Sequence, residues 1–263
     1  MKKMRLFFSI PARSGMLAIA LCAGFSSCQE RDVLPAATEK KTDIQELTDY
    51  LVTTTGHAAG SIVYDAEAKN FVIDEDILIS EADVRQRLKG ASGGRTEQWR
   101  WYYLVADTYV TNIDYYLEPS VPASWKTATR QAIGHWNALN GTRLLLQETT
   151  DRSQADVVVN TGYASANWIA RAYLPFSNGQ PGNEITINTK YNYLRATYKE
   201  FAITHEMGHT FGLTHTNQTE GEFITGTPTS DPNSVMNATV LAWNGFTDGD
   251  ATAVQVLYPA QPE

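Results

Sequence analysis

Apolar residues recur at helical spacing over residues 124–139, in the longest amphipathic segment of the chain. This spacing predicts a helix with one apolar stripe, and Asn140-Gly141 supplies the stop signal after it. The stripe consists of Trp125, Ala128, Ala132, Ile133, Trp136 and Leu139.

Short runs rich in β-branched and aromatic residues predict strands around this helix. We expect them at residues 99–105, 143–148 and 156–160, followed by a hairpin over 169–188 that turns at Ser177-Asn178-Gly179. A second long helix is predicted over residues 194–212. Several strands and two long helices in this order indicate an α+β domain over residues 98–263, whose sheet backs the second helix.

A smaller α+β unit is predicted before it, over residues 41–90. Residues 43–51 have helical spacing, and two short strands, 71–73 and 77–79, flank the acidic turn Asp74-Glu75-Asp76. Ser80, with the carboxylate of Asp83 three residues on, is typical of the start of a second helix toward Leu88. Glycines then interrupt the pattern, and residues 91–97 are interpreted as a linker.

The chain begins with a basic segment that precedes an apolar run at residues 16–25. The run is too short to span a bilayer, so residues 1–27 are interpreted as a secretory signal. Phe25-Ser26-Ser27-Cys28 resembles a loose bacterial lipobox, which makes Cys28 the expected lipidation site and residues 28–40 a tether. Ordinary signal cleavage near the same place is the alternative. The lipobox implies an outer-membrane lipoprotein of a Gram-negative-type bacterium, on the cell surface or the periplasmic face.

Composition narrows the class of partner. The chain of 263 residues is 43% hydrophobic and 19% charged, as in soluble globular proteins. Residues 1–27 carry four basic groups and no acidic one, so their removal changes the formal charge from −8 to −12. This charge argues against nucleic acid or an anionic lipid surface as a partner. The only other cysteine, Cys22, lies in the signal, so the mature chain has no disulfide.

The most informative motif is H-E-x-x-H-x-x-G-x-x-H at residues 205–215. Residues four apart lie on one face of a helix, so His205 and His209 can aim at one zinc ion. Glu206 lies about 100° around the helix, beside the metal rather than toward it. Gly212 ends the helix because it tolerates positive φ, and the chain can return His215 as the third ligand. Three histidines leave one position of a tetrahedral zinc open, which is the catalytic pattern.

A bare H-E-x-x-H also occurs by chance, but the added glycine and third histidine at fixed offsets make coincidence far rarer. Downstream, Ser234-Val235-Met236-Asn237 lies in a polar, turn-rich stretch. In the metzincin pattern, a Met-turn follows the motif and forms the floor beneath the metal. With both motifs, residues 98–259 resemble a matrixin-like metzincin zinc peptidase. They are most similar to the bacterial dual-action HEIGH metallopeptidases, with Met207 in place of isoleucine.

The resemblance implies a metzincin-type (zincin) domain with a twisted mixed β-sheet, a backing helix and an active-site helix. It implies one catalytic zinc and hydrolysis of peptide bonds within a protein or peptide substrate, with Glu206 as the general base. An extended substrate is expected along the edge strand at Ala170, Arg171 and Ala172. Asn237, Ala238 and the residues up to Trp243 are expected to wall the neighbouring pocket.

The chain differs from the animal matrixins in residues that bind their additional metal ions. Residues 169–188 contain no histidine to hold a second, structural zinc, and they lack the acidic pair expected for calcium. Calcium binding therefore stays open. No tyrosine closely follows Met236, so the auxiliary ligand of astacin-like relatives is not expected. His135 is interpreted as structural, and His57 has no nameable partner.

Two further hypotheses concern an enzyme kept latent by its amino-terminal unit and a protein without catalytic activity. Residues 29–95 contain no cysteine that could silence the zinc. If residues 41–90 act as an inhibitory propeptide, the zinc site must be blocked by a carboxylate such as Asp74 or Asp76, or by steric cover. The alternative function is a surface lipoprotein that binds zinc or a partner protein without catalysis. The intact Glu206 and ligand set favour the enzyme.

Overall fold

A computed structural model describes residues 42–88, 99–216, 221–228 and 230–261. Residues 41–263 make up one compact unit. The predicted signal, Cys28 with its tether, and the predicted linker 91–97 lie outside the described residues. Within the described ranges, no helix has both the length and the apolar character needed to cross a membrane.

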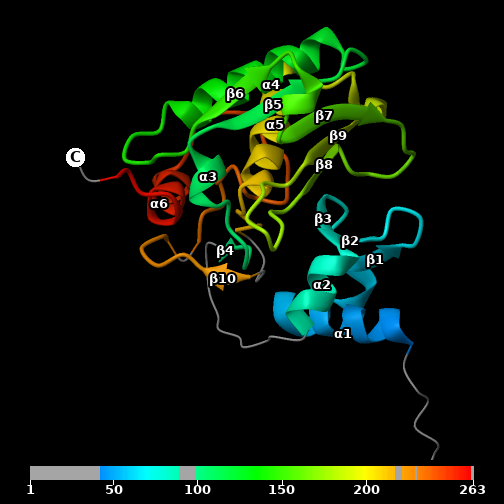
Figure 1. Ribbon diagram of the computed structural model, residues 1–263. Helices are drawn as coiled ribbons and strands as arrows, with labels where there is room; N and C mark the ends of the chain where they lie inside the picture. Colours follow the sequence, from blue (N-terminus) through cyan, green and yellow to red (C-terminus); the bar gives the residue numbers. More distant parts are fainter. Residues whose placement is uncertain (1–41, 89–98, 217–220, 229, 262–263) are drawn as a thin grey trace, which may run out of the picture. The chain divides into compact units, whose positions relative to one another are not determined.

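The helices and strands follow one another as shown in Figure 1. The helices are α1 (Asp43–Thr55), α2 (Glu81–Leu88), α3 (Asp107–Val110), α4 (Ala123–Asn137), α5 (Ala196–Thr210) and α6 (Asp248–Leu257). The strands are β1 (Ile62–Asp65), β2 (Asn70–Ile73), β3 (Ile77–Ser80), β4 (Trp99–Arg100), β5 (Ile113–Leu117), β6 (Leu146–Thr149), β7 (Val157–Gly162), β8 (Ala170–Tyr173), β9 (Glu184–Asn188) and β10 (Glu222–Phe223).

Eight strands form one mixed sheet in the order β1-β2-β3-β8-β9-β7-β5-β6. β7 pairs in parallel with β5 and β9, and β8 runs antiparallel to β9, so residues 169–188 form the predicted hairpin. β3 joins the other edge of β8 in parallel, with Ile77 opposite Ala172. The strands before residue 88 therefore continue the sheet that carries the rest of the chain.

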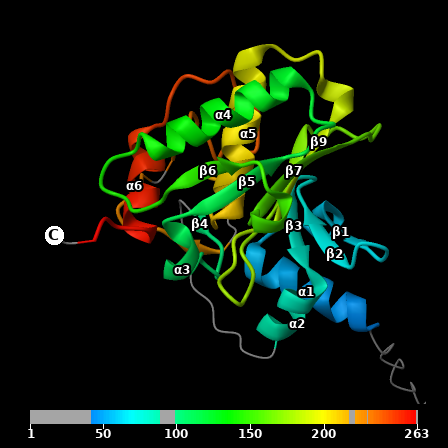
Figure 2. The ribbon, with the colours of Figure 1, turned by 45° about the horizontal axis from the view of Figure 1, so that its top comes forward.

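The helices α4 and α5 pack against each other and against the sheet, and they cross in Figure 2. The predicted stripe of α4 is buried through Trp136, with Leu139 partly buried after the helix ends. Trp136 meets Phe211 edge to face, with ring centroids 4.8 Å apart. This packing places α5 in the main hydrophobic core, and the α+β fold class is confirmed.

A second hydrophobic cluster lies under α1 and α2. It combines Leu47, Leu51, Phe71 and Ile77 with Trp101 from the later part of the chain. Local signals start and end the helices around it. The Thr42 hydroxyl accepts from the Gln45 amide at 3.3 Å, and Gly56 ends α1 at φ 78°. The Ser80 hydroxyl accepts from the Asp83 amide at 3.1 Å, as its spacing predicted.

One predicted strand is wrong over most of its length. Residues 99–105 form a strand only at β4, which is two residues long and pairs with β10. Trp101 and Tyr102 then leave the extended ladder, and the Arg87 guanidinium lies 3.2 Å from the centre of the Tyr102 ring. Tertiary packing of the aromatic rings thus outweighs their strand propensity.

Candidate metal centre

The helix α5 and the turn after it supply the three histidines of the motif. His205 and His209 lie one turn apart on α5. Gly212 has φ 103°, its amide donates to the His209 carbonyl at 3.0 Å, and the chain then returns His215. The turn predicted at this glycine is therefore present, in a conformation that residues with side chains rarely adopt.

The three imidazoles converge in the interior of the protein. All three histidines are at most 4% exposed. Ligand atoms from His205, His209, His215 and Asp76 all lie within 4.8 Å of one another. The predicted ligand histidines are thus brought together, and a carboxylate from the turn before β3 joins them.

The hydrogen bonds of two histidines fix where their lone pairs point. Nδ1 of His205 donates to the Val235 carbonyl at 2.7 Å, and Nδ1 of His209 donates to the Leu213 carbonyl at 2.8 Å. In neutral rings this leaves both Nε2 atoms without a proton, yet they face each other at 2.9 Å. Two lone pairs at this distance repel unless a cation lies between them, so the residues fit a metal ion.

Electrostatics favour the metal-binding forms of His209 and Asp76. Burial, with the neighbouring His205 and His215, lowers the pKa of His209 to about 3. Burial alone would raise the pKa of Asp76, but the charges and hydrogen bonds of His215 and His205 hold it well below its usual range. The neutral imidazole of His209 and the ionised carboxylate of Asp76 are both ordinary zinc ligands.

Glu206 borders the cluster without belonging to it. Its side chain is buried, and Oε2 has no hydrogen-bond partner among the described residues. Burial, and after it the negative charge of Asp76, raise the pKa of Glu206 well above its usual range. The position beside the metal ligands is the one expected from the helical spacing.

Met236 lies against the ligand helix, as a Met-turn residue should. Its sulfur is 2.4 Å from the position that a Cβ on Gly208 would take, so the turn and the helix are in close contact. The turn is held from α6: Asp250 accepts from the Ser234 hydroxyl at 2.5 Å and from the Val235 amide at 3.1 Å. Asp250 was not predicted as a site residue, although it stands three residues after Thr247 in a capping box.

A cavity of about 310 Å³ opens beside His205 and Glu206. Two of the predicted cleft residues, Ala170 and Ala238, line it. Arg171 lines a neighbouring cavity of about 740 Å³ instead. Ala172 is buried in the sheet, and Asn237 does not line the 310 Å³ cavity. The remaining walls are Asp74, Glu75, Asp76, Asn167, Trp168, Ile169, Ala202, Thr239 and Val240.

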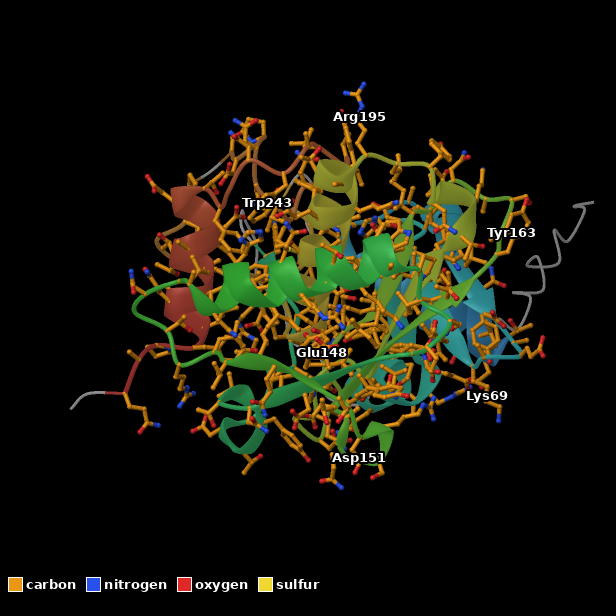
Figure 3. The ribbon with its side chains drawn as sticks, turned by 90° about the horizontal axis from the view of Figure 1, so that it is seen from above. Lys69, Glu148, Asp151, Tyr163, Arg195 and Trp243 are labelled. Atoms are coloured by element: carbon orange, nitrogen blue, oxygen red, sulfur yellow. The ribbon has the colours of Figure 1, made fainter. Side chains whose placement is uncertain are left out.

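The other two histidines have partners outside the cluster. Nε2 of His135 is 2.7 Å from Oε1 of Glu200, and its ring stacks on Trp243, labelled in Figure 3, at 4.4 Å. Nδ1 of His57 is 3.2 Å from Oδ1 of Asp74. His57 therefore contacts the acidic turn that carries Asp76, which the sequence did not indicate.

Three clustered histidines on and after an H-E-x-x-H helix, with a methionine turn against that helix, define a zinc metallopeptidase of the metzincin type. Residues 71–258 match the dual-action HEIGH metallo-peptidase family, Peptidase_M57, and the chain belongs to it. The predicted resemblance is confirmed, and the matched region begins earlier than residue 98, so that it includes β2 and β3.

Two solved structures are similar to this chain at low sequence identity. Myroilysin is 12% identical, with 57% of this chain and 81% of that chain covered and a TM-score of 0.42. High choriolytic enzyme 1, a hatching enzyme zinc-protease from the medaka fish Oryzias latipes, is 15% identical, with 60% and 94% covered and a TM-score of 0.39. No curated protein matches the chain at a significant level.

Proposed function

We propose that this zinc metallopeptidase is an endopeptidase that acts outside the cytoplasm, with Glu206 as its general base. One observation carries the catalytic part. The buried Glu206 carboxylate lies in the wall of the same cavity as His205, and its Oε2 has no partner among the described residues. A carboxylate that faces an open cavity beside metal ligands is placed to receive a proton there.

Zinc, when bound by His205, His209 and His215, supplies a Lewis acid and lowers the pKa of water toward about 7. Glu206 takes the proton of the attacking water and then gives it to the leaving amine. Its raised pKa suits both steps, because a base must hold the proton before it can return it. The ligand histidines keep their orientation through the Val235 and Leu213 carbonyls.

The cavity supports a polypeptide substrate. Ala202, Ala238 and Val240 offer small or apolar walls, and Trp168 also lines the cavity. Such a cavity fits one side chain of a substrate next to the bond that is cut. The edge of β8 away from β9 offers a row of amides and carbonyls that can bind the backbone of an extended chain once β3 no longer pairs with it.

Glu206→Gln tests the catalytic role. We expect the variant to keep its zinc and to lose cleavage of casein and gelatin, whereas Glu184→Gln, an acid outside the cluster, should retain it. Zinc content is measured alongside hydrolysis. Undiminished cleavage by Glu206→Gln contradicts the mechanism. If the wild-type protein binds zinc but cleaves no member of a protein library, the result favours the alternative, a non-catalytic zinc- or protein-binding lipoprotein.

Location is proposed on sequence alone: the basic start, the short apolar run at residues 16–25 and the lipobox-like segment that ends at Cys28. Incorporation of labelled palmitate in the native host tests it, with Cys28→Ala as the variant and Cys22→Ala as the matched control. Label and membrane association should be lost only in Cys28→Ala. Protease treatment of intact cells then distinguishes the cell surface from the periplasmic face.

A further inference from the structure

The edge of β8 that a substrate needs is occupied by the chain itself. β3 pairs with it in parallel, with Leu78 opposite Tyr173. The Ala172 amide donates to the Asp76 carbonyl at 3.0 Å, and the Leu174 amide donates to the Leu78 carbonyl at 3.1 Å. A segment from before residue 88 therefore uses the backbone groups that would hold an extended substrate.

The same segment brings a carboxylate to the metal ligands. Asp76 immediately precedes β3, and its Oδ2 is 3.3 Å from Nε2 of His215 and 3.7 Å from Nε2 of His205. Its ligand atom belongs to the single group of metal-binding donors found within the described ranges. Three histidines and one carboxylate make a complete tetrahedral set, which is how closed rather than catalytic zinc sites are built.

The turn that aims this carboxylate has an uncommon backbone. Asp74 and Glu75 both have positive φ, 48° and 74°, although neither is glycine. Such conformations cost free energy and persist where surrounding contacts hold them. The Asp74 amide donates to the Ser61 carbonyl at 3.1 Å, and the Arg171 side chain donates to the Glu75 carbonyl from β8. The turn is thus fastened from both sides with Asp76 directed at the histidines.

We propose that Asp76 is the fourth ligand of the zinc and that residues 74–80 occupy the cleft in place of a substrate, so that the chain is latent as folded. This inference rests on the proposed function and adds its regulation. With the carboxylate in the fourth position, Glu206 has no water there to activate, and the β8 edge cannot bind a second strand. Activity requires displacement of the segment that carries Asp76.

The test compares Asp76→Ala with Glu67→Ala in the full mature chain. Glu67 is the control because it is an exposed acid in the turn between β1 and β2 and lines neither cavity. We expect Asp76→Ala to cleave a quenched casein substrate at least about tenfold faster than the wild type, and Glu67→Ala to behave like the wild type. Adding Glu206→Gln to Asp76→Ala should remove the gained activity.

A second readout does not need activity. Each protein is loaded with Co²⁺, and its visible spectrum is titrated with acetohydroxamate, which needs an accessible position on the metal. We expect at least about tenfold tighter binding to Asp76→Ala than to the wild type or Glu67→Ala. Equal affinity in all three proteins overturns the proposal that Asp76 is a zinc ligand. A difference in affinity without cleavage by any variant supports that proposal and contradicts the proposed peptidase activity.

The outcome stays decisive if Asp76→Ala fails to fold. Asp76→Asn keeps the size and shape of the side chain but removes its charge, and it is titrated in the same way. It should bind acetohydroxamate more tightly than the wild type, because a neutral amide is a weaker zinc ligand than a carboxylate. Affinity equal to that of the wild type contradicts the proposal.

Discussion

The sulfur of Met236 lies 2.4 Å from the point where a Cβ on Gly208 would stand. Gly208 is in α5 between His205 and His209, two of the proposed metal ligands. A side chain at this position would have to push the methionine aside, so the glycine lets the Met-turn contact the ligand helix directly.

Gly208→Ala should therefore destabilise the protein, by about 1–2 kcal/mol net, because overpacking outweighs the gain in helix propensity. Met236→Ala removes the obstacle. In the double variant, the cost of Gly208→Ala should disappear, which gives a coupling of about 1–2 kcal/mol in a double-mutant cycle. Urea denaturation of the four zinc-loaded proteins measures it. Additive costs would mean that the two residues do not compete for the same space.

Asp250 connects α6 to the turn that orients His205, a proposed metal ligand. Its carboxylate accepts from Ser234 and Val235, and the Val235 carbonyl in turn accepts from His205. Asp250→Ala should lower the free energy of unfolding by about 2–3 kcal/mol, since it leaves buried donors without an acceptor. It should also weaken zinc binding about tenfold or more, as loss of outer ligand contacts does.

Asp248→Ala is the control for this prediction, because Asp248 is an exposed acid in the same first turn of α6. It should cost about 0.3–1 kcal/mol through the helix dipole alone. Zinc affinity is measured by competition with a chromogenic chelator. Unchanged affinity in Asp250→Ala would contradict the connection between α6 and His205.

The sequence predicts the parts of this site that depend on local spacing. The long helices and the hairpin follow from their apolar periodicity and turn residues, and the histidines of α5 follow from one motif. Contacts between distant segments leave no such signal. Asp76 and Ala172 are almost a hundred residues apart in the chain, so the sequence offers Asp74 and Asp76 only as alternatives. Residues 99–105 are the opposite case. Their composition predicts a strand, but the packing of the aromatic rings sets the conformation after Arg100.

The Arg130–Glu148 pair gives a pH dependence away from the metal. Nε of Arg130 is 2.7 Å from Oε2 of Glu148, labelled in Figure 3, and this hydrogen bond holds the pKa of Glu148 below its usual value. The pair therefore adds stability above the unfolded pKa of about 4.3 and loses it as the pH falls through the lower folded pKa.

Arg130→Met should cost about 0.5–1 kcal/mol at pH 7, because both side chains are partly exposed to water. Near pH 3 the difference from the wild type should shrink toward zero. Gln131→Met, an exposed position on α4, serves as the control. Urea denaturation at both pH values measures the effect, and a cost that grows on acidification would contradict it.

Removal of the metal should destabilise the folded protein, because three buried imidazoles then lose the ion that holds them together. At a zinc concentration a thousand times the Kd, binding contributes about 4 kcal/mol, which corresponds to a fall in Tm of roughly 8–16 °C for a domain of this size. Differential scanning calorimetry with dipicolinate measures it. Added zinc should restore the Tm and magnesium should not. Glu206→Gln should keep the shift, and His209→Ala should lose it.

A variant of Arg171 tests whether the Asp76 carboxylate is held at the metal site or only lies close to it. Its guanidinium lies over the Trp168 ring, 4.4 Å from the centroid, and its side chain donates to the Glu75 carbonyl. If Arg171 fixes the acidic turn, Arg171→Met should let Asp76 leave the metal part of the time. The Co²⁺ protein should then bind acetohydroxamate with an affinity between those of the wild type and Asp76→Ala. In an Asp76→Ala background the same change should have no further effect, because no ligand remains to be held. An equal increase in both backgrounds would show that Arg171 blocks the cleft by its own bulk.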